Sequence, residues 1–218
     1  MIKIVPSGDT IIILKDLKNL KSSTLTSYIE KLNFDEIEDI ISLKNSVGVI
    51  FNPYKTTSNK LIKKFKSNIS NKRFTNKKNL KTWKIPICYD EEFGIDLNEI
   101  SKNCKLDIAQ IKKKHCSVTY EVDLIGFLPG FLYLGNLVES LYTQRRNNPR
   151  TNIPKGSVGI AGNQTGIYNI ESPGGWNIIG RTPIKLFDKL NNPPIYIKQG
   201  DKIIFEEITK EKFYSYRN

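Results

Sequence analysis

No apolar run in this 218-residue sequence approaches the roughly 18 residues that a membrane-spanning helix requires. The first residues, Met1 to Pro6, are too poor in apolar side chains for a secretory signal, and no small-residue cleavage site follows them. We therefore expect a cytoplasmic protein without a membrane partner. Hydrophobic residues make up 39% of the chain and charged residues 26%, a composition typical of a globular protein that buries a core.

The signatures of metal sites and of activated nucleophiles are also missing. Cys88, Cys104 and Cys116 are an odd number without a C-x-x-C pair, so we expect reduced structural thiols and no metal. The sequence contains no Gly-Lys pair for a Walker A loop, and neither a G-x-S-x-G motif nor a second histidine for a serine hydrolase. His115 and Cys116 are adjacent on a predicted helix and face different directions, which excludes a Cys–His dyad.

Acidic residues are absent between Ile40 and Tyr89, where twelve lysine and arginine residues match the whole net charge of +12. Such a basic run either binds a phosphate backbone or forms a solvated face. Between Lys55 and Lys81 the only interleaved aromatic residues are Phe65 and Phe74, and no nucleic-acid-binding motif is present. The pattern favours a solvated surface, so we expect no nucleic-acid partner.

Alanine is nearly absent, and lysine takes 28 of the 34 basic positions, a bias that we attribute to genome drift. Against this bias, four of the six arginines lie between residues 145 and 181, and ten of the fourteen glycines lie between residues 126 and 180. A retained arginine suggests a need for the planar fork that grips carboxylate or phosphate. A retained glycine suggests a backbone angle or a close approach that other residues do not allow. Residues 126–181 are therefore the candidate functional window.

Hydrophobic periodicity predicts a small α/β domain over residues 1–80, with the order β-β-α-β-β-α and helices on one face of antiparallel strands. Strands are predicted at 2–5, 10–14, 37–43 and 47–51, with helices from Ser22 or Ser23 through Leu32 and around Leu61 to Ile69. The polar and basic residues at about 71–82 are predicted to be a linker.

A mainly β domain is predicted over residues 83–218. It begins with a strand at 83–89 and a short helix from Asp96 or Leu97 to Asn103, and continues with a helix that Asp107 caps and that ends near His115. Glycine and proline turns then separate short strands, a pattern typical of a barrel or sandwich. These strands are predicted at 117–127, 157–161, 166–169, 177–179, 195–197 and 202–207.

Three glycine-rich stretches carry a resemblance to a known family. They are GFLPGFLYLG at 126–135, PRTNIPKGSVGIAGNQTGIY at 149–168 and SPGGWNIIGRTP at 172–183. Together with the segment 89–97 and the helix that ends in His115, they closely resemble the allophanate hydrolase subunit 1 family, also called the KipI or PxpB family. The resemblance covers nearly the whole chain, and it is strong from Ile85 onward and loose before it.

The resemblance implies a small N-terminal α/β domain and a C-terminal cyclophilin-like β-barrel, without implying prolyl isomerase activity. It implies a non-autonomous subunit of a bacterial ATP-dependent 5-oxoprolinase, which converts 5-oxoproline to L-glutamate. The implied partners are a C subunit, similar to KipA or allophanate hydrolase subunit 2, and an A subunit, similar to LamB/YcsF proteins. The implied cofactor is ATP with Mg in the complex, with no biotin on this chain.

Two other functions known in the family remain open. One is inhibition of a sporulation histidine kinase, in which the chain would have no chemistry of its own. The other is carboxyl transfer to a urea-like substrate, which would need a biotin carrier on another chain.

The candidate substrate- or nucleotide-binding residues lie in the same window. Arg150 and Arg181, which we expect in glycine- and proline-rich loops, are candidate clamps for a carboxylate or phosphate. Gln164, Thr165 and Tyr168 offer the neutral hydrogen bonds that a small lactam such as 5-oxoproline would need. Arg145 and Arg146 are predicted to be surface or interface charges.

His115, the only histidine, is the candidate catalytic residue, as a general base or a substrate donor. The alternative is a histidine that interacts with the last carbonyls of its helix. The glycines of 156–166 either present N–H groups to an anion or form tight turns. A further set has two possible uses, as barrel core or as the wall of a pocket or partner interface. This set comprises Pro129, Gly130, Phe131, Tyr133, Gly174, Gly175 and Trp176.

Overall fold

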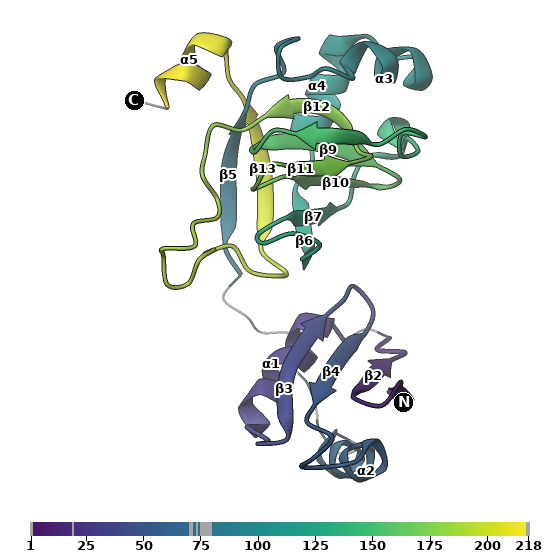
Figure 1. The fold of residues 1–218 in the computed structure, drawn as a ribbon. Coiled ribbons are helices and arrows are strands. Elements are labelled where there is room, and N and C mark those ends of the chain that lie inside the picture. Colours follow the sequence, from purple (N-terminus) through teal and green to yellow (C-terminus); the bar gives the residue numbers. More distant parts are fainter. Residues whose placement is uncertain (1, 19, 70–71, 73, 75–79, 217–218) are drawn as a thin grey trace. The chain divides into compact units, whose positions relative to one another are not determined.

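The computed structural model describes residues 2–18, 20–69, 72, 74 and 80–216. The chain folds into two compact units, Met1–Asn79 and Leu80–Asn218, each with a hydrophobic core of its own (Figure 1). Most of the predicted linker at about 71–82 lies outside the described residues. None of the helices in the described ranges is long and apolar enough to cross a lipid bilayer.

The first unit is a four-stranded antiparallel sheet with two helices packed against one face. The buried residues of its central strands alternate along the chain, and they form one cluster with Leu25 of the first helix and Leu61 and Phe65 of the second. The order β-β-α-β-β-α is the one that the periodicity predicts. The elements are β1 (Lys3–Ser7), β2 (Ile11–Lys15), α1 (Ser22–Leu32), β3 (Ile37–Ser42), β4 (Val47–Phe51) and α2 (Ser58–Ile69), with the sheet order β1-β2-β4-β3.

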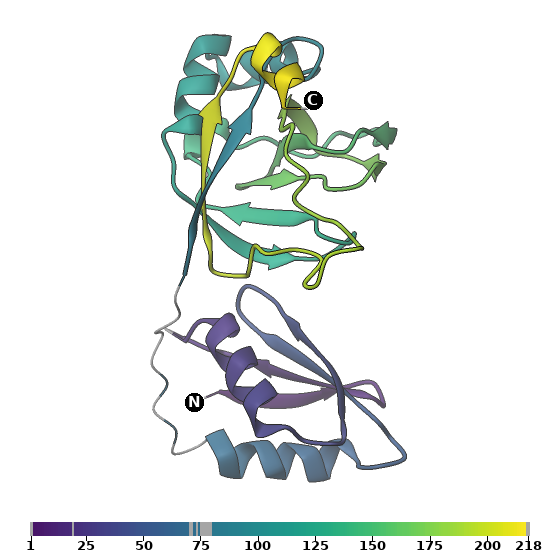
Figure 2. The ribbon, with the colours of Figure 1, turned by 90° about the vertical axis from the view of Figure 1, so that its left-hand side faces the viewer.

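The second unit is built on a curled seven-stranded sheet (Figures 1 and 2). Its edge strands are β12 and β5, and the order across the sheet is β12-β9-β10-β7-β6-β13-β5. β5 and β13 pair in parallel, and the other neighbouring strands are antiparallel. The strands are β5 (Thr82–Ile87), β6 (Tyr120–Ile125), β7 (Leu132–Gly135), β9 (Ser157–Ala161), β10 (Gln164–Ile167), β12 (Asn177–Arg181) and β13 (Lys202–Glu207).

The two edges of this sheet meet at one point, so that it forms a half-barrel. Just beyond β5, the backbone N–H of Cys88 donates to the carbonyl of Arg181, and the N–H of Arg181 donates back to the carbonyl of Cys88, both at 2.9 Å. β8 (Arg150–Ile153) and β11 (Ser172–Gly174) form a separate two-stranded sheet. The helices are α3 (Leu97–Cys104), α4 (Ile108–Cys116), the short η1 (Glu139–Leu141) and α5 (Lys210–Ser215).

Local sequence signals explain the helix boundaries. Asp107 caps α4, because its carboxylate accepts from the N–H of Gln110 at 2.7 Å while the Gln110 side chain accepts from the N–H of Asp107 at 2.9 Å. The strand predicted at 195–197 is wrong, since this segment is irregular. Pro193 and Pro194 precede it and lack the N–H groups that a sheet ladder needs. α5, the short η1 and the strands β7, β8 and β11 were not predicted.

Glycines let the sheet carry a second core on its other face. Val158 and Ile160 of β9 face the main core, whereas Gly159 faces the opposite way and lies across from Gly166 of β10. A Cβ atom on Gly166 would lie 2.9 Å from the ring of Phe131 and 3.1 Å from that of Trp176. The two glycines therefore form a floor on which aromatic rings lie.

Replacing Gly166 with alanine is expected to lower the free energy of unfolding by about 1–3 kcal/mol, because the new methyl group has to displace packed rings and the carbonyl of Leu132. The matched control is Gly126→Ala, whose Cβ meets nothing nearer than Leu124 at 3.9 Å. It should stay within about 1 kcal/mol of the parent chain. Urea unfolding curves measure both variants, and equal stability would contradict the glycine floor.

Candidate functional site

Most of the residues predicted from the sequence lie in three places in the second unit, with Arg181 and Gln164 outside them. One group forms a buried chain of hydrogen bonds around His115. Another forms an aromatic cluster on the glycine floor. A third belongs to an ion network around a buried carboxylate.

His115, near the end of α4, is fully buried, and both of its ring nitrogens have partners inside the chain. Nδ1 lies 2.7 Å from the hydroxyl of Tyr89, and Nε2 lies 3.0 Å from Oγ1 of Thr165. The Thr165 hydroxyl donates to the carbonyl of Gly159 at 3.0 Å, so its oxygen accepts from Nε2–H. His115 is therefore the neutral Nε2–H tautomer, and its Nδ1 accepts from Tyr89.

The chain of hydrogen bonds extends to Cys116, whose sulfur lies 3.2 Å from the Tyr89 hydroxyl. Burial lowers the pKa of His115 from 6.5 to about 3 and raises the pKa values of Tyr89 and Cys116. All of these groups are therefore neutral near pH 7. In this structure both ring nitrogens of His115 are bonded within the chain, so neither is free to bond a substrate or a helix carbonyl.

The predicted aromatic residues form one cluster on the glycine floor. The ring centroid of Phe131 lies 4.7 Å from that of Tyr133, 4.8 Å from Tyr168 and 5.6 Å from Trp176. Phe131, Tyr168 and Trp176 are buried, and Tyr133 is half-buried. The exposed Arg145 places its guanidinium 5.8 Å from the Trp176 ring centroid. The cluster thus has a buried interior and a rim with a cation.

The remaining members of the predicted pocket wall lie at the edges of this cluster. Pro129 is exposed, and Gly130 is buried against Phe187. Gly174 packs so closely on the hydroxyl of Tyr168 that a Cβ atom there would collide with it, and Gly175 is half-buried.

The structure does not bring the three predicted amide-binding residues together at one opening. Gln164 is partly buried, and its Nε2 donates to the carboxylate of Asp123 at 3.2 Å. Thr165 faces the main core and Tyr168 lies inside the aromatic cluster, and both are fully buried.

Arg150 lies on β8, where we expected a loop, and its fork is already occupied by a carboxylate of the chain itself. Its two terminal nitrogens donate to Asp96 at 2.8 and 2.6 Å. Asp96 is 2% exposed, and it also accepts from Arg146 at 2.8 Å and from the backbone N–H of Ile178 at 2.6 Å. Arg146, predicted to be a surface or interface charge, is thus part of a network inside the chain that continues to Glu99 at 2.8 Å.

Arg181, the other predicted clamp, is the last residue of β12 and is half-buried. Its Nε donates to the carbonyl of Lys155 at 3.1 Å, and its guanidinium lies 5.8 Å from the ring centroid of Phe93. The segment 182–190, which directly follows Arg181, lines a pocket of about 750 Å³ together with Lys155, Gly156 and other residues.

The glycines of 156–166 do not form a phosphate cradle. The N–H of Gly156 donates to the carbonyl of Tyr168, and the N–H of Gly162 donates to the carbonyl of Thr143, both at 2.6 Å. Gly159 and Gly166 pair with strands on both sides. The residues present therefore do not fit a nucleotide phosphate at this position. Within the described ranges, no group of three or more His, Cys, Asp or Glu side chains is arranged to hold a metal ion.

Replacing Arg150 with lysine is expected to lower the free energy of unfolding by about 1–2 kcal/mol, because one ammonium cannot make both bonds to the buried Asp96. Arg146 remains and limits the loss. The control is Lys185→Met, whose pair with Asp188 is exposed and should change stability by less than about 0.5 kcal/mol. Chemical denaturation curves of the parent chain and both variants measure these changes. An unchanged free energy of unfolding in Arg150→Lys would show that the pair of Arg150 and Asp96 does not stabilise the fold.

The burial of His115 predicts a loss of stability at mildly acidic pH. Its pKa in the folded chain, about 3, lies below the unfolded value near 6.5, so protons bind preferentially to the unfolded state and stability falls as pH falls through this interval. Between about pH 7 and about pH 5 the free energy of unfolding should drop by about 2 kcal/mol. Because the chain has a single histidine, His115→Gln should remove most of this dependence even if it lowers stability throughout. If the free energy of unfolding depends equally on pH in the parent chain and in His115→Gln, the titration of His115 is not the cause.

A family model described as carboxyltransferase domain, subdomain C and D, matches residues 2–197. The chain is 43% identical over 133 residues to the B subunit of 5-oxoprolinase from Bacillus subtilis, a match that covers 61% of this chain and 55% of that protein. The chain thus spans about half the length of the curated relatives it matches.

Two solved structures show the same architecture. A conserved uncharacterized protein of Pyrococcus horikoshii is 33% identical with a TM-score of 0.59, over 97% of this chain and 100% of that one. The urea carboxylase of Kluyveromyces lactis is 20% identical with a TM-score of 0.76, over 98% of this chain and 22% of that one, which is a likeness of fold. Because the family model covers most of the sequence, this chain belongs to the carboxyltransferase domain family, subdomain C and D.

Proposed function

We propose that this chain is the B subunit of a bacterial ATP-dependent 5-oxoprolinase and acts with partner subunits to convert 5-oxoproline to L-glutamate. The observation that carries the proposal is its identity to the Bacillus subtilis protein of that name, above 40% over more than half of the chain. The proposed partners are a C subunit similar to KipA or allophanate hydrolase subunit 2 and an A subunit similar to LamB/YcsF proteins. A cytoplasmic location is part of this proposal.

The proposal includes a cyclophilin-like β-barrel as the second domain, after a small α/β domain over about residues 1–80. The curled sheet supports this, since its edge strands meet at Cys88 and Arg181. The positions of the glycines in the window 126–181 support it too, because they allow both faces of the sheet to be covered.

The chemistry of this chain favours a subunit that forms its site together with a partner. Its single histidine is sealed in the core, and its glycine-rich segment has no free row of N–H groups for phosphate. We therefore place ATP, with Mg, on a partner or at a shared surface, and no biotin on this chain. The residues here that stay candidates for substrate contact are Arg181 and Gln164, both partly buried.

The proposed surface for the C subunit is the rim of the aromatic cluster. Tyr133 is half-buried, and Pro129 and Arg145 are exposed next to buried aromatic rings. Aromatic and arginine side chains with an apolar body and a polar tip are enriched at protein interfaces. The half-buried Gly175 belongs to the same rim.

Carboxyl transfer is the second candidate, favoured by the description of the matching family and by the fold of the urea carboxylase. It would require a biotin carrier supplied by another chain. The two candidates differ in substrate, because the first needs 5-oxoproline and ATP and the second needs a urea-like acceptor and carboxylated biotin.

The purified chain alone is expected to hydrolyse no ATP in response to 5-oxoproline, and activity should appear when the A and C subunits are added. Glutamate formation and phosphate release measure this.

In the same assay Arg181→Lys should lower turnover by about ten- to hundredfold, because lysine keeps the charge and loses the fork. Lys84→Arg on the exposed edge of β5 is the control. Turnover by the isolated chain, or a reconstituted complex that uses only urea and a biotin carrier, would overturn the proposal.

A further inference from the structure

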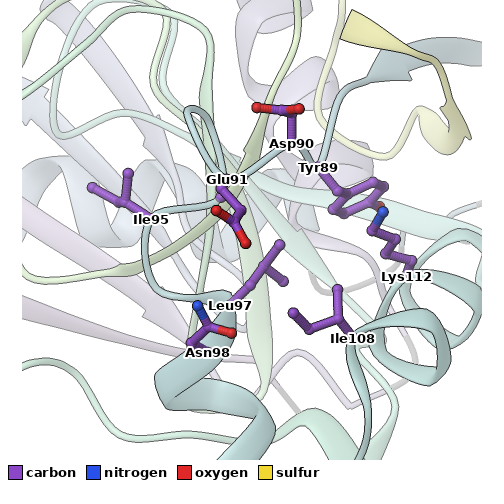
Figure 3. Close-up of a pocket in the computed structure, with 9 residues that line it drawn as sticks. Tyr89, Asp90, Glu91, Ile95, Leu97, Asn98, Ile108 and Lys112 are labelled. Carbon is purple, nitrogen blue, oxygen red and sulfur yellow. The ribbon is translucent and has the colours of Figure 1, made fainter.

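A second pocket lies away from the aromatic cluster, between the loop after β5, the start of α3 and one side of α4. Its volume is about 430 Å³, within the usual range of small-molecule sites. Figure 3 shows Leu97 and Ile108 at its base, with the ring of Tyr89 on one side and Ile95 on the other. The base of the pocket is therefore apolar.

The walls of this pocket are held in place by contacts inside the chain. The hydroxyl of Tyr89 is fixed by His115, as described above. In the loop, the N–H groups of Phe93 and Gly94 both donate to the carbonyl of Asp90 at 2.8 Å. A Cβ atom on Gly94 would lie 2.5 Å from Leu97, so the loop lies directly on α3. A ligand would enter a preformed site, which lowers the entropic cost of binding.

Opposite charges face this pocket from separate walls without pairing with each other. The carboxylate of Glu91 and the carboxamide of Asn98 have no partner in the part of the chain that the structure describes, and Figure 3 shows both side chains at the pocket. Lys112 lies on the other side, where its one ion-pair partner among these residues is Glu207 at 3.2 Å.

The neighbouring acidic residues do not change this balance. Lys210 donates to Asp90 at 3.3 Å and to Glu92 at 2.8 Å. The hydroxyl of Tyr214 also donates to Glu92 at 2.7 Å. Among the described residues that line the pocket, the unpaired carboxylate is therefore that of Glu91, across an apolar base from an ammonium.

We propose that this pocket binds a zwitterionic α-amino acid with an aliphatic side chain. The ammonium of the ligand pairs with Glu91 and donates to the carboxamide oxygen of Asn98, and its carboxylate pairs with Lys112. Its side chain lies on Leu97 and Ile108. The proposal goes beyond the 5-oxoprolinase function and does not rest on it, because 5-oxoproline has no ammonium and would leave Glu91 unpaired.

Isothermal titration of the full chain tests this with three probes that share the isobutyl group of leucine. L-Leucine carries both charges, 4-methylpentanoate lacks the ammonium, and 3-methylbutylamine lacks the carboxylate. We expect L-leucine to bind at least about tenfold more tightly than either analogue, because each analogue loses one charged hydrogen-bonding contact. Glycine, which keeps both charges and lacks the side chain, should also bind more weakly.

Two variants assign the charges to the walls. Glu91→Gln should weaken L-leucine and the amine by about tenfold and leave the acid unchanged, whereas Lys112→Met should weaken L-leucine and the acid and leave the amine unchanged. Glu38→Gln and Lys63→Met, on exposed positions of the first unit, are the matched controls. Thermal melts confirm that every variant is folded.

Failure to bind L-leucine at millimolar concentration overturns the proposal, as does equal binding of the three probes. It is also overturned if Glu91→Gln and Lys112→Met bind like their controls, or if each variant weakens both single-charge probes alike. Because the titration uses the chain alone, its outcome is independent of whether the reconstituted complex turns over 5-oxoproline.

Discussion

The carboxylate of Asp96 is the interaction on which the arrangement of the functional window depends. It is buried, and Arg150, Arg146 and the N–H of Ile178 all donate to it, which offsets the cost of burying the carboxylate. These donors come from β8, from the segment before β8 and from β12, while Asp96 lies just before the first residue of α3. One buried charge thus joins the small second sheet and a helix to the edge of the main sheet.

This arrangement separates the chemistry of the chain into faces. The main core holds His115 and its neutral hydrogen-bond partners, the opposite face of the sheet holds the aromatic cluster, and the α3–α4 side holds the pocket beside Tyr89. Tyr89 belongs to two of these regions, because its hydroxyl bonds His115 while its ring lines the pocket. A change in the hydrogen bonds around His115 would therefore shift the wall of the pocket through the side chain of Tyr89.

Much of the fold could be predicted from the sequence because its signals are local. Three such signals each act within a few residues. They are the Asp107 cap, the helical spacing of apolar residues in α1 and α2, and the glycines in the turns between strands. The roles of the site residues could not be predicted in this way. Asp96 and Arg150 are 54 residues apart, and His115 and Thr165 are 50 apart, so their pairing depends on tertiary structure. Arg150 and His115 matched the pattern of ligand-binding groups, and the fold uses both for its own stability. Glu91, Asn98 and Lys112 were missed because each is an ordinary surface residue until α3 and α4 are placed side by side.

The pairing of β5 with β13 has a consequence for the synthesis of the chain on the ribosome. Thr82 of β5 lies opposite Lys202 of β13, so β5 has no parallel partner until residues 120 positions further along the chain have been synthesised. The first unit has a core formed wholly from earlier residues and can fold as soon as it leaves the exit tunnel. The second unit instead keeps an unpaired, apolar strand exposed until β13 has been made. Contacts of such long sequence separation form slowly, and this interval is when the nascent chain is most exposed to aggregation and most in need of a chaperone.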